Sequence, residues 1–405
     1  MAEAPVGLTD PAGSPPKADE PWNPLAERAV VSHSCPVTDW QIIPVPVPSS
    51  LGAPEAWAVH GGAAVRQAVE LARLGHDDLA ARAPEIISHL MMADYSRNVE
   101  VVAVPADVTE PTTADVVGYA HASLPLTSNP HLAYLGLEVH PAHRGHGAGA
   151  ALLAEVERIA VDNGRSVLIA WTEQLGDPAP DDPTALRPPT GSGLVRGDEP
   201  GVLLALRRGY ALEQAERYSV LQLPVDLALL NALHADALRR AGDAYRLHTW
   251  EGDVPAEWVE QFAVLRTRMS TDVPMAGLEI EEDPWDAARV RQEEEEARRS
   301  GHAALTTAVE HVPTGALVGY SGIDYALDRP QPAFQDDTLV LKEHRGRRLG
   351  MLVKSDALRR LGELRPDAER LHTWNAEENA YMLAINVALG FKPTGVVGMW
   401  QKRLG

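Results

Sequence analysis

A glycine-rich stretch carries the residue types best suited to bind an anionic ligand. Arg144-Gly145-His146-Gly147-Ala148-Gly149 follows a strand-like run that ends at Pro141, and it opens a segment whose apolar residues have helical spacing. Glycine lets a backbone pass close to a ligand, and the free N–H groups at the start of a helix attract an anion. The stretch therefore indicates an anion-binding loop, with a plain turn as the alternative. Two nucleotide loops are excluded, since no Gly-Lys-Ser/Thr follows and the glycines are not spaced as Gly-x-Gly-x-x-Gly.

A second stretch repeats the pattern later in the chain. Arg345-Gly346-Arg347-Arg348-Leu349-Gly350 keeps the arginine, the glycine after it and the last glycine, and it has Arg348 where the first copy has Gly147. Val117-Gly118-Tyr119 also recurs, as Val318-Gly319-Tyr320, at the separation of 201 residues that relates the loops. Equal separations indicate duplicated domains. Arg347 or Arg348 could supply charge to a phosphate, or both could face solvent.

Carboxylates precede both loops and could accept a proton. Asp336 and Asp337 open the strand before the second loop. Neighbours on a strand point to opposite faces, so only one can face a cleft, and we favour Asp337. A solvated acid is the alternative for Asp337, and Glu138 is the matching candidate in the first half. His140 and His344 flank the loops and titrate near neutrality, but lone histidines are more often incidental.

The first loop and the strand before it, which ends Val139-His140-Pro141, resemble a known ligand-binding signature. This is the acyl-coenzyme A loop of the GCN5-related N-acetyltransferase (GNAT) superfamily, (Q/R)-x-x-G-x-(G/A) after Val-x-Pro. In the second half, Asn375, Asn379 and Leu389-Gly390-Phe391 are similar to the family's end-of-strand asparagine, the helix after it and the motif that closes that helix. The resemblance covers Trp40 to Leu404. Its tandem form is similar to that of mycothiol synthase, in which the C-terminal copy does the chemistry.

The resemblance implies acetyl-CoA, or another acyl-CoA, as cosubstrate. In this family the loop amides hold the pyrophosphate, and a splayed fourth strand offers a backbone N–H to the thioester carbonyl. In the second half, Asn379 could simply cap its helix. The coenzyme-binding residues implied in this way are Leu137, Val139, Arg144, Gly145, His146, Gly147, Ala148 and Gly149 in the first half, and Thr338, Val340, Arg345, Gly346, Arg347, Arg348, Leu349, Gly350, Asn375 and Asn379 in the second.

The resemblance also implies direct attack of a primary amine of a small molecule on the thioester. An amine with a pKa of roughly 10.4 is mostly protonated in water, so attack needs a base. Many members carry a tyrosine, as general acid, four residues before a glycine; here Asn386 and Ala205 hold that position. The catalytic candidates are Asp337, Asn386 and Glu138, and we expect the second half to do the chemistry. The alternative is an acyl-CoA-binding protein with one or both halves non-catalytic.

Composition limits the other classes of function. The 405 residues carry a formal charge of −21 and 45% hydrophobic residues, which argues against nucleic-acid binding and supports real cores. One cysteine, Cys35, fits a reducing cytoplasm, and no membrane-length apolar run is present. No cluster with metal-ligand spacing stands out, so we expect no metal. We expect a monomer or a homodimer.

The elements that must position these residues follow the same order in both halves. We expect strands at 40–47, 100–105, 116–124, 131–140, 166–172, 216–223, 245–250, 303–311, 316–325, 337–341, 370–374 and 396–402. We expect helices at 56–74, 80–95, 202–208, 255–269, 284–299, 349–364 and 378–389, and a further helix after the first loop. This order predicts an α/β (α+β) fold, with two tandem GNAT-type domains that are each a twisted, mostly antiparallel sheet with helices on both sides. The predicted domains are a flexible tail (1–35), an N-terminal domain (36–225), a helical linker (226–244) and a C-terminal domain (245–405). Residues 173–200 are expected to form a mobile loop beside the first cleft.

Overall fold

The computed structural model describes residues 40–91 and 94–404. The predicted tail and Cys35 lie outside these residues. The first half of the chain contains β1 (Trp40–Pro44), α1 (Trp57–Leu74), α2 (Ala83–Met91), β2 (Ser96–Pro105), β3 (Gly118–Pro125), β4 (Leu132–Val139), α3 (Ala148–Asp162), β5 (Val167–Leu175), β6 (Ala185–Leu186), β7 (Val195–Arg196), α4 (Pro200–Arg207) and β8 (Ala211–Gln222).

The second half repeats this order after an additional helix. It contains α5 (Leu227–Ala241), β9 (Tyr245–Glu251), α6 (Val259–Asp272), α7 (Ala287–Ser300), β10 (His302–His311), β11 (Ala316–Ala326), β12 (Pro332–Val340), α8 (Leu349–Leu364), β13 (Arg370–Ala376), α9 (Ala380–Leu389) and β14 (Lys392–Arg403). Short 3-10 turns, η3 (Pro141–His143) and η4 (Lys342–His344), precede the two glycine loops.

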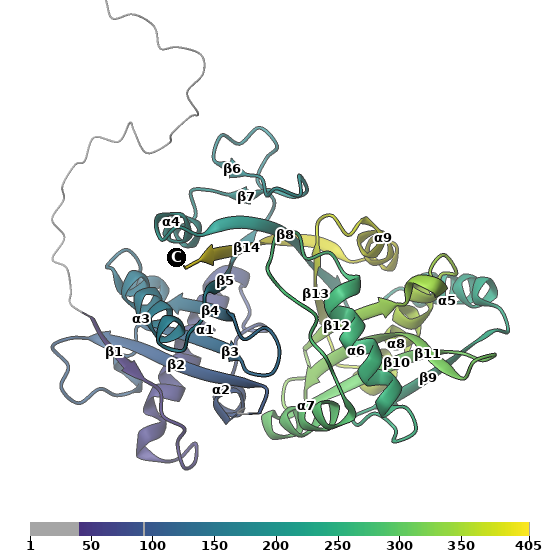
Figure 1. Cartoon of the computed structure of the whole chain (residues 1–405), viewed down its shortest axis with the longest axis horizontal. Helices are drawn as coiled ribbons and strands as arrows, with labels where there is room; N and C mark the ends of the chain where they lie inside the picture. Colours follow the sequence, from purple (N-terminus) through teal and green to yellow (C-terminus); the bar gives the residue numbers. More distant parts are fainter. Residues whose placement is uncertain (1–39, 92–93, 405) are drawn as a thin grey trace, which may run out of the picture. The chain divides into compact units, whose positions relative to one another are not determined.

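Twelve of the described strands form one sheet, in the order β1-β2-β3-β4-β5-β14-β8-β13-β12-β11-β10-β9 (Figure 1). All neighbouring pairs are antiparallel except β4–β5 and β12–β13. Alternate residues of β2 pack into different cores: Val101 and Ala103 lie with residues of α3 and α4, whereas Val102 and Val104 lie with residues of α1 and α2. Helices therefore cover both faces, and the predicted mixed fold with a mostly antiparallel sheet is confirmed.

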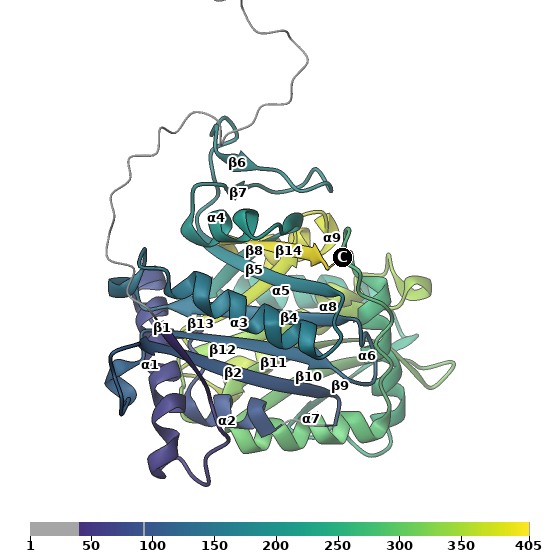
Figure 2. The same cartoon turned by 60° about the vertical axis from the view of Figure 1, so that its left-hand side comes forward.

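The two halves exchange their last strands. β14, the last strand of the chain, pairs with β5 of the first half, while β8 of the first half pairs with β13 of the second (Figure 2). β14 and β8 also pair with each other at the junction. We call β1–β5, α1–α4 and β14 the first lobe, and β9–β13, α5–α9 and β8 the second lobe. The predicted domain bounds stay a prediction, but the sheet shows that each lobe contains a strand from the other half.

The predicted linker is a helix that packs on the second lobe. Asp226 caps α5 by accepting the N–H groups of Ala228 and Leu229. Leu230 and Ala237 of α5 are buried in the core of the second lobe, and His234 Nδ1 lies 3.2 Å from Ser355 Oγ on α8. Because its apolar face is covered by this core, α5 is part of the lobe.

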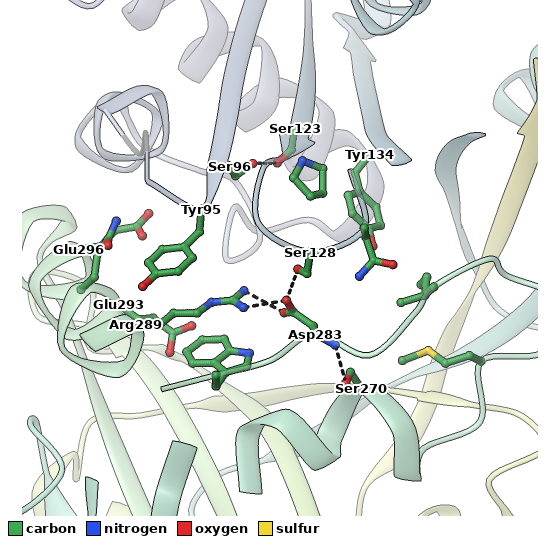
Figure 3. Close-up of a pocket in the computed structure, with 16 residues that line it drawn as sticks. Tyr95, Ser96, Ser123, Ser128, Tyr134, Ser270, Asp283, Arg289, Glu293 and Glu296 are labelled. Atoms are coloured by element: carbon green, nitrogen blue, oxygen red, sulfur yellow. Dashed lines mark hydrogen bonds and ion pairs between the residues drawn. The ribbon is translucent and has the colours of Figure 1, made fainter. Parts of the chain in front are cut away.

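The α1–α2 loop of the first lobe and the α6–α7 loop of the second each bind the opposite lobe. Asp78, between α1 and α2, lies 3.0 Å from His372 Nε2 on β13. Between α6 and α7, the Glu281 N–H donates to Asn129 Oδ1 at 2.7 Å. Beside this second contact, a cavity of about 380 Å³ holds Arg289 against Asp283, with Nη1 and Nη2 at 2.7 and 2.8 Å from the carboxylate oxygens (Figure 3). These contacts fix the lobes to each other beyond the shared sheet.

The expected loop at 173–200 is only partly irregular. β5 continues to Leu175, and β6 and β7 form a small antiparallel ribbon before α4 begins at Pro200. The mobility of this segment stays a prediction. β12 also begins earlier than expected, at Pro332, because Pro332–Phe334 pair with β13. Within the described residues, no helix combines the length and apolar character that a membrane span requires.

Candidate active site

The central feature of the first lobe is a wedge between two parallel strands. β4 and β5 pair only from Leu132 and Val167 to Leu135 and Ala170. Beyond this point β4 stays bound to β3 as far as Val139, whereas β5 stays bound to β14 as far as Leu175. Each strand follows its outer neighbour, so the two separate and leave polar backbone edges facing an opening.

Backbone alternation identifies which amides face the wedge. The His140 N–H bonds to the Val117 carbonyl on the β3 side, at 2.9 Å. Successive residues of a strand direct their N–H groups to opposite edges, so the N–H groups of Leu137 and Val139 face β5. In the second lobe, the Leu341 N–H bonds to the Val318 carbonyl at 2.9 Å, which directs Thr338 and Val340 toward β13.

The first glycine loop lies at the end of this wedge. Gly145 and Gly147 have φ angles of 82° and 88°, a region that favours glycine, and the helical ladder of α3 begins with Ala151 N–H bonding to the Gly147 carbonyl at 3.1 Å. The amides of the preceding first turn are therefore left for a ligand. Arg144 Nε donates to the Val139 carbonyl at 3.1 Å, and Trp40 Nε1 donates to the His146 carbonyl at 2.7 Å. Both bonds hold the loop against the strands.

The second glycine loop has the same path but a different charge environment. Arg348 has a φ of 61° at the position of Gly147, which is uncommon for a residue with a Cβ. Arg345 Nη2 lies 3.2 Å from Asp272, and Arg348 Nε lies 3.6 Å from Asp236. Across residues 40–91 and 94–404, Arg144 in the first loop has no carboxylate partner. Carboxylates thus already pair with two of the three arginines of the second loop and would repel a phosphate there.

A cavity of about 940 Å³ connects the first loop with the wedge. It continues past the wedge to α1 and α4, so that the loop, both strand edges and several charged side chains open into one space. The polar and charged residues of its wall include Arg66, Glu70, Arg73, Tyr119, His121, Glu138, His143, Arg144, Thr172, Glu173, Gln174, Arg196, Glu199, Arg207 and Tyr210.

Glu138 is the carboxylate nearest the wedge amides. Burial raises its pKa, although Arg66, with Nε 3.5 Å from Glu138 Oε1, opposes the shift. Among the described residues, Glu138 Oε2 has no hydrogen-bond partner. Next to it, burial lowers the pKa of His121 to about 3, so that this imidazole is neutral. His121 packs over Gly136, where any side chain would collide with the ring.

Further carboxylates lie at the α1 end of the cavity. Arg73 Nη2 donates to both oxygens of Glu70, at 2.8 and 2.7 Å, and Arg73 also forms an ion pair with Glu173. Burial raises the pKa of Glu70 to about 7. Together with Glu138 and Arg66, this end of the cavity holds three carboxylates and two arginines. The excess of acidic groups favours a cationic ligand.

Asp337 of the second lobe is enclosed by its neighbours. Arg266 Nη1 lies 3.2 Å from Asp337 Oδ2, and the Tyr320 hydroxyl donates to the same oxygen at 2.9 Å. Burial and the neighbouring Asp336 raise its pKa to about 6. The predicted match to Glu138 is wrong in register, because Glu138 pairs with Tyr119 whereas the residue that pairs with Tyr320 is Leu339.

The asparagines in α9 and shortly before it bind groups within the second lobe. Asn386 is 2% exposed and its Nδ2 donates to Asn375 Oδ1 at 2.6 Å. Asn379 Oδ1 accepts the N–H of Met382 at 3.3 Å, so the alternative role of Asn379 as a helix cap is confirmed.

The ladder of α8 begins with Leu352 N–H bonding to the Arg348 carbonyl at 3.0 Å, which leaves Leu349 and Gly350 in its first turn.

One pair of residues in the cavity wall was missed by the sequence analysis. Trp400 Nε1 of β14 donates to Thr172 Oγ1 of β5 at 2.9 Å, and both residues line the cavity. The Trp171-Thr172 pair repeats Trp374-Asn375 of the second half, and this repeat could have pointed to Thr172. No comparable signal marks Trp400, because its position depends on the strand exchange. Within residues 40–91 and 94–404, no group of three or more His, Cys, Asp or Glu side chains could hold a metal ion.

Comparisons with known proteins agree with this geometry. Residues 84–179, from α2 past β5, match the model of the Acetyltransferase (GNAT) family. A solved tandem GNAT protein from the clavulanic acid biosynthesis pathway is 23% identical, with a TM-score of 0.66 over 91% of this chain and 99% of its own. A GCN5-related N-acetyltransferase from Sphaerobacter thermophilus is 12% identical, with a TM-score of 0.54 over 90% of this chain and 95% of its own. No curated protein sequence matches the chain significantly.

Proposed function

Because the chain is a tandem-domain N-acetyltransferase of the GNAT superfamily, we propose that its first lobe moves an acetyl group from acetyl-CoA to a primary amine of a small molecule. One observation carries this assignment: a single cavity joins the glycine loop, the wedge amides and Glu138. Binding, carbonyl polarisation and proton removal require these three parts to be contiguous. The family match to residues 84–179 lies in the same lobe.

The residues of the first lobe divide the work by position. We assign the amides of residues 145–149 and the Arg144 side chain to the pyrophosphate, because most of this loop lines the cavity and a helix start favours such an anion. The N–H of Leu137 faces the wedge and can stabilise the oxyanion that forms on the thioester carbonyl. Glu138, one residue further along β4, takes a proton from the ammonium form of the acceptor, directly or through a water molecule, so that the neutral amine can attack.

We assign a supporting role to the second lobe, in contrast to the preference that the sequence suggested. Two of the three arginines of its loop are paired with Asp272 and Asp236, and Asp337 is held between Arg266 and Tyr320. Of the two predicted coenzyme sites, the one in the first lobe therefore binds more tightly. The alternative function, acyl-CoA binding without turnover, applies to the second lobe at most.

The acceptor class follows from the charges in the cavity. Three carboxylates and two arginines lie near the α1 end, so the carboxylates are in excess when all are ionised. Burial raises the pKa of Glu70 to about 7, and a cation bound beside it would favour its ionised form. An amine is cationic in water and complements this excess of negative charge. We propose a small cationic amine, such as a polyamine or an amino sugar, as acceptor.

Calorimetry with acetyl-CoA and a transfer assay with a panel of polyamine, amino-sugar and peptide amines test the proposal. Gly147→Asp puts a side chain and a negative charge at the positive φ of the first loop, so we expect binding and transfer to be lost. Arg345→Glu makes the second loop more negative in turn, and we expect it to leave transfer nearly unchanged. Selective loss of binding in Arg345→Glu, with Gly147→Asp unaffected, would overturn the choice of lobe.

A further inference from the structure

A hydroxyl group stands across the wedge from the proposed oxyanion donor. β4 and β5 keep a constant register over their paired segment, from Leu132 and Val167 to Leu135 and Ala170. Continued beyond the point of separation, this register places Thr172 level with Leu137. Thr172 is partly exposed and lines the cavity, as Leu137 does. A thioester with its carbonyl oxygen at the Leu137 N–H would therefore lie between these two residues.

A residue from the far end of the chain holds the Thr172 side chain. Trp400 is fully buried, and its indole Nε1 donates to Thr172 Oγ1 at 2.9 Å. β14 brings Trp400 there because Gly398 pairs with Thr172 and Trp400 pairs with Ala170. An indole N–H only donates, so the hydroxyl hydrogen of Thr172 must be directed elsewhere. No acceptor for it is found in the described part of the chain, which leaves it for a ligand in the cavity.

Ala205, at the position where many members have the tyrosine, offers no polar group. It is 7% exposed on α4, in the same cavity wall as Thr172. On its α4 side, Thr172 lies close to Gly201: a Cβ there would lie 3.4 Å from Thr172 Cγ2, an ordinary contact distance. The threonine methyl group thus faces α4, while the oxygen faces Trp400. The cavity wall has two other hydroxyl groups, on Tyr119 and Tyr210. Tyr119 lies on β3, on the other side of β4 from the wedge, and Tyr210 precedes β8, so Thr172 is the hydroxyl residue across the wedge from Leu137.

We propose that Thr172 is a catalytic residue of the first lobe, which stabilises the departing coenzyme thiolate, and that Trp400 is its positioning residue. This inference rests on the proposed function. The amine nitrogen forms a bond to the acetyl carbon, and the carbon–sulfur bond breaks with its electron pair on sulfur. The nitrogen gives up two protons: the first passes from the ammonium to Glu138 before the neutral amine attacks, and the second passes to water once the bond to carbon has formed. Thr172 donates a hydrogen bond to the thiolate but keeps its proton, because an alcohol is a weaker acid than a thiol, and solvent protonates the released coenzyme.

The test compares how free CoA and acetyl-CoA bind to the full-length protein between about pH 7 and about pH 10, a range that begins below and ends above the cysteine reference pKa of roughly 8.5, so that the ionised fraction of the coenzyme thiol rises across it. In the wild type, CoA should bind more tightly as the pH rises, because the thiolate accepts the Thr172 hydrogen bond. Thr172→Val removes the hydroxyl at nearly constant volume and should weaken CoA binding at high pH by roughly tenfold or more, the scale of a hydrogen bond to a charged group. Acetyl-CoA has no thiol, so its affinity should stay nearly constant.

Two further variants separate the hydroxyl from mere packing. Thr172→Ser keeps the hydroxyl and should retain the pH dependence, whereas Trp400→Phe removes the orienting N–H and should reduce it. Identical pH dependence in the wild type and in Thr172→Val would overturn the inference while leaving the proposed function intact. If neither CoA nor acetyl-CoA binds to the wild type, the proposed function itself fails.

Discussion

Glu138 pairs with an arginine of α1 and Asp337 with an arginine of α6, but only Glu138 of these two opens into the large cavity. Glu138→Gln should lower turnover by about a hundredfold or more, the usual scale for a lost base, and leave acetyl-CoA affinity nearly unchanged. Asp337→Asn should be much milder. Steady-state transfer rates together with calorimetry measure both effects. If Asp337→Asn abolishes transfer while Glu138→Gln stays active, the second lobe does the chemistry, as the sequence suggested.

His302 links the lobes through a charged contact. Its Nε2 lies 3.2 Å from Glu85 of α2, and its Nδ1 lies 2.7 Å from Asp324 of β11. Burial lowers the pKa of His302, but hydrogen bonds to Asp324 and Glu85 outweigh burial and raise the pKa to about 9. The protonated histidine therefore stabilises the folded protein fully below pH 6.5, and this contribution is lost as the pH rises to about 9.

Thermal unfolding between about pH 6 and about pH 9.5 measures the His302 contribution. These limits lie about half a unit below the ordinary histidine pKa of 6.5 and about half a unit above the folded-state pKa of about 9. The wild type should lose stability across this range relative to His302→Gln, which cannot gain the proton. Equal pH dependence in the two proteins would show that the His302 contacts do not persist in solution.

Sequence reasoning located the residues whose chemistry is local. Glycines at positive φ and an arginine beside them identified both loops, since the backbone itself requires those residue types. Glu138 followed from alternation along β4. Thr172 could not be found in this way, because a threonine near the end of a strand has many ordinary uses. Its significance depends on Trp400, more than two hundred residues away in the chain.

At the scale of elements, the second loop stores backbone strain at one residue. Arg348 has a φ of 61°, where a Cβ is unfavourable, and it makes only a partly exposed ion pair with Asp236. Arg348→Gly should therefore stabilise the protein, by up to about 1 kcal/mol in the free energy of unfolding. Arg347→Gly is the matched control, because Arg347 does not have a positive φ and glycine there only adds unfolded-state entropy. Denaturant unfolding that shows no difference between the two variants would contradict this account.

Apolar periodicity predicted most helices and strands to within a few residues, yet it did not predict the strand exchange. Alternation along a strand specifies which face is buried, and both β8 and β14 satisfy it beside either lobe. The neighbour is decided by interactions between distant segments, such as Trp400 with the core formed by α3 and α4. The register difference between Glu138 and Asp337, by contrast, was readable from the sequence, because the separation of 201 residues relates Glu138 to Leu339, the residue that pairs with Tyr320.

At the scale of the whole molecule, the exchanged strands make the halves interdependent. Residues 1–225 alone lack β13 and β14, so β5 and both edges of β8 would expose unpaired backbone groups, and residues 226–405 alone lack β5 and β8. Each half expressed separately should therefore be insoluble or oligomeric. Co-expressed halves should co-purify as a one-to-one complex that binds acetyl-CoA, and size-exclusion chromatography with calorimetry checks this.

A matched pair of cuts sharpens this test. A chain cut between α5 and β9 places β8 and β14 in different fragments from their partners β13 and β5. A cut in the β6–β7 ribbon instead gives two fragments that each contain a contiguous block of the sheet, with only the β5–β14 pair between them. The second cut should leave the thermal unfolding midpoint nearly unchanged. A soluble, monomeric first half with a cooperative unfolding transition would refute the interdependence.

The exchange also constrains how such a duplicated chain can diverge. After an ordinary duplication, one copy is free to decay once the other performs the reaction. On the function proposed above, the second half of the chain does not catalyse the reaction, yet it supplies the strand that carries Trp400 into the first lobe, and it receives β8 in return. Mutations in the second loop, such as an arginine in place of glycine, can accumulate without harm to catalysis, whereas frameshifts and terminal deletions cannot. Selection thus preserves the scaffold of the second lobe independently of its binding site.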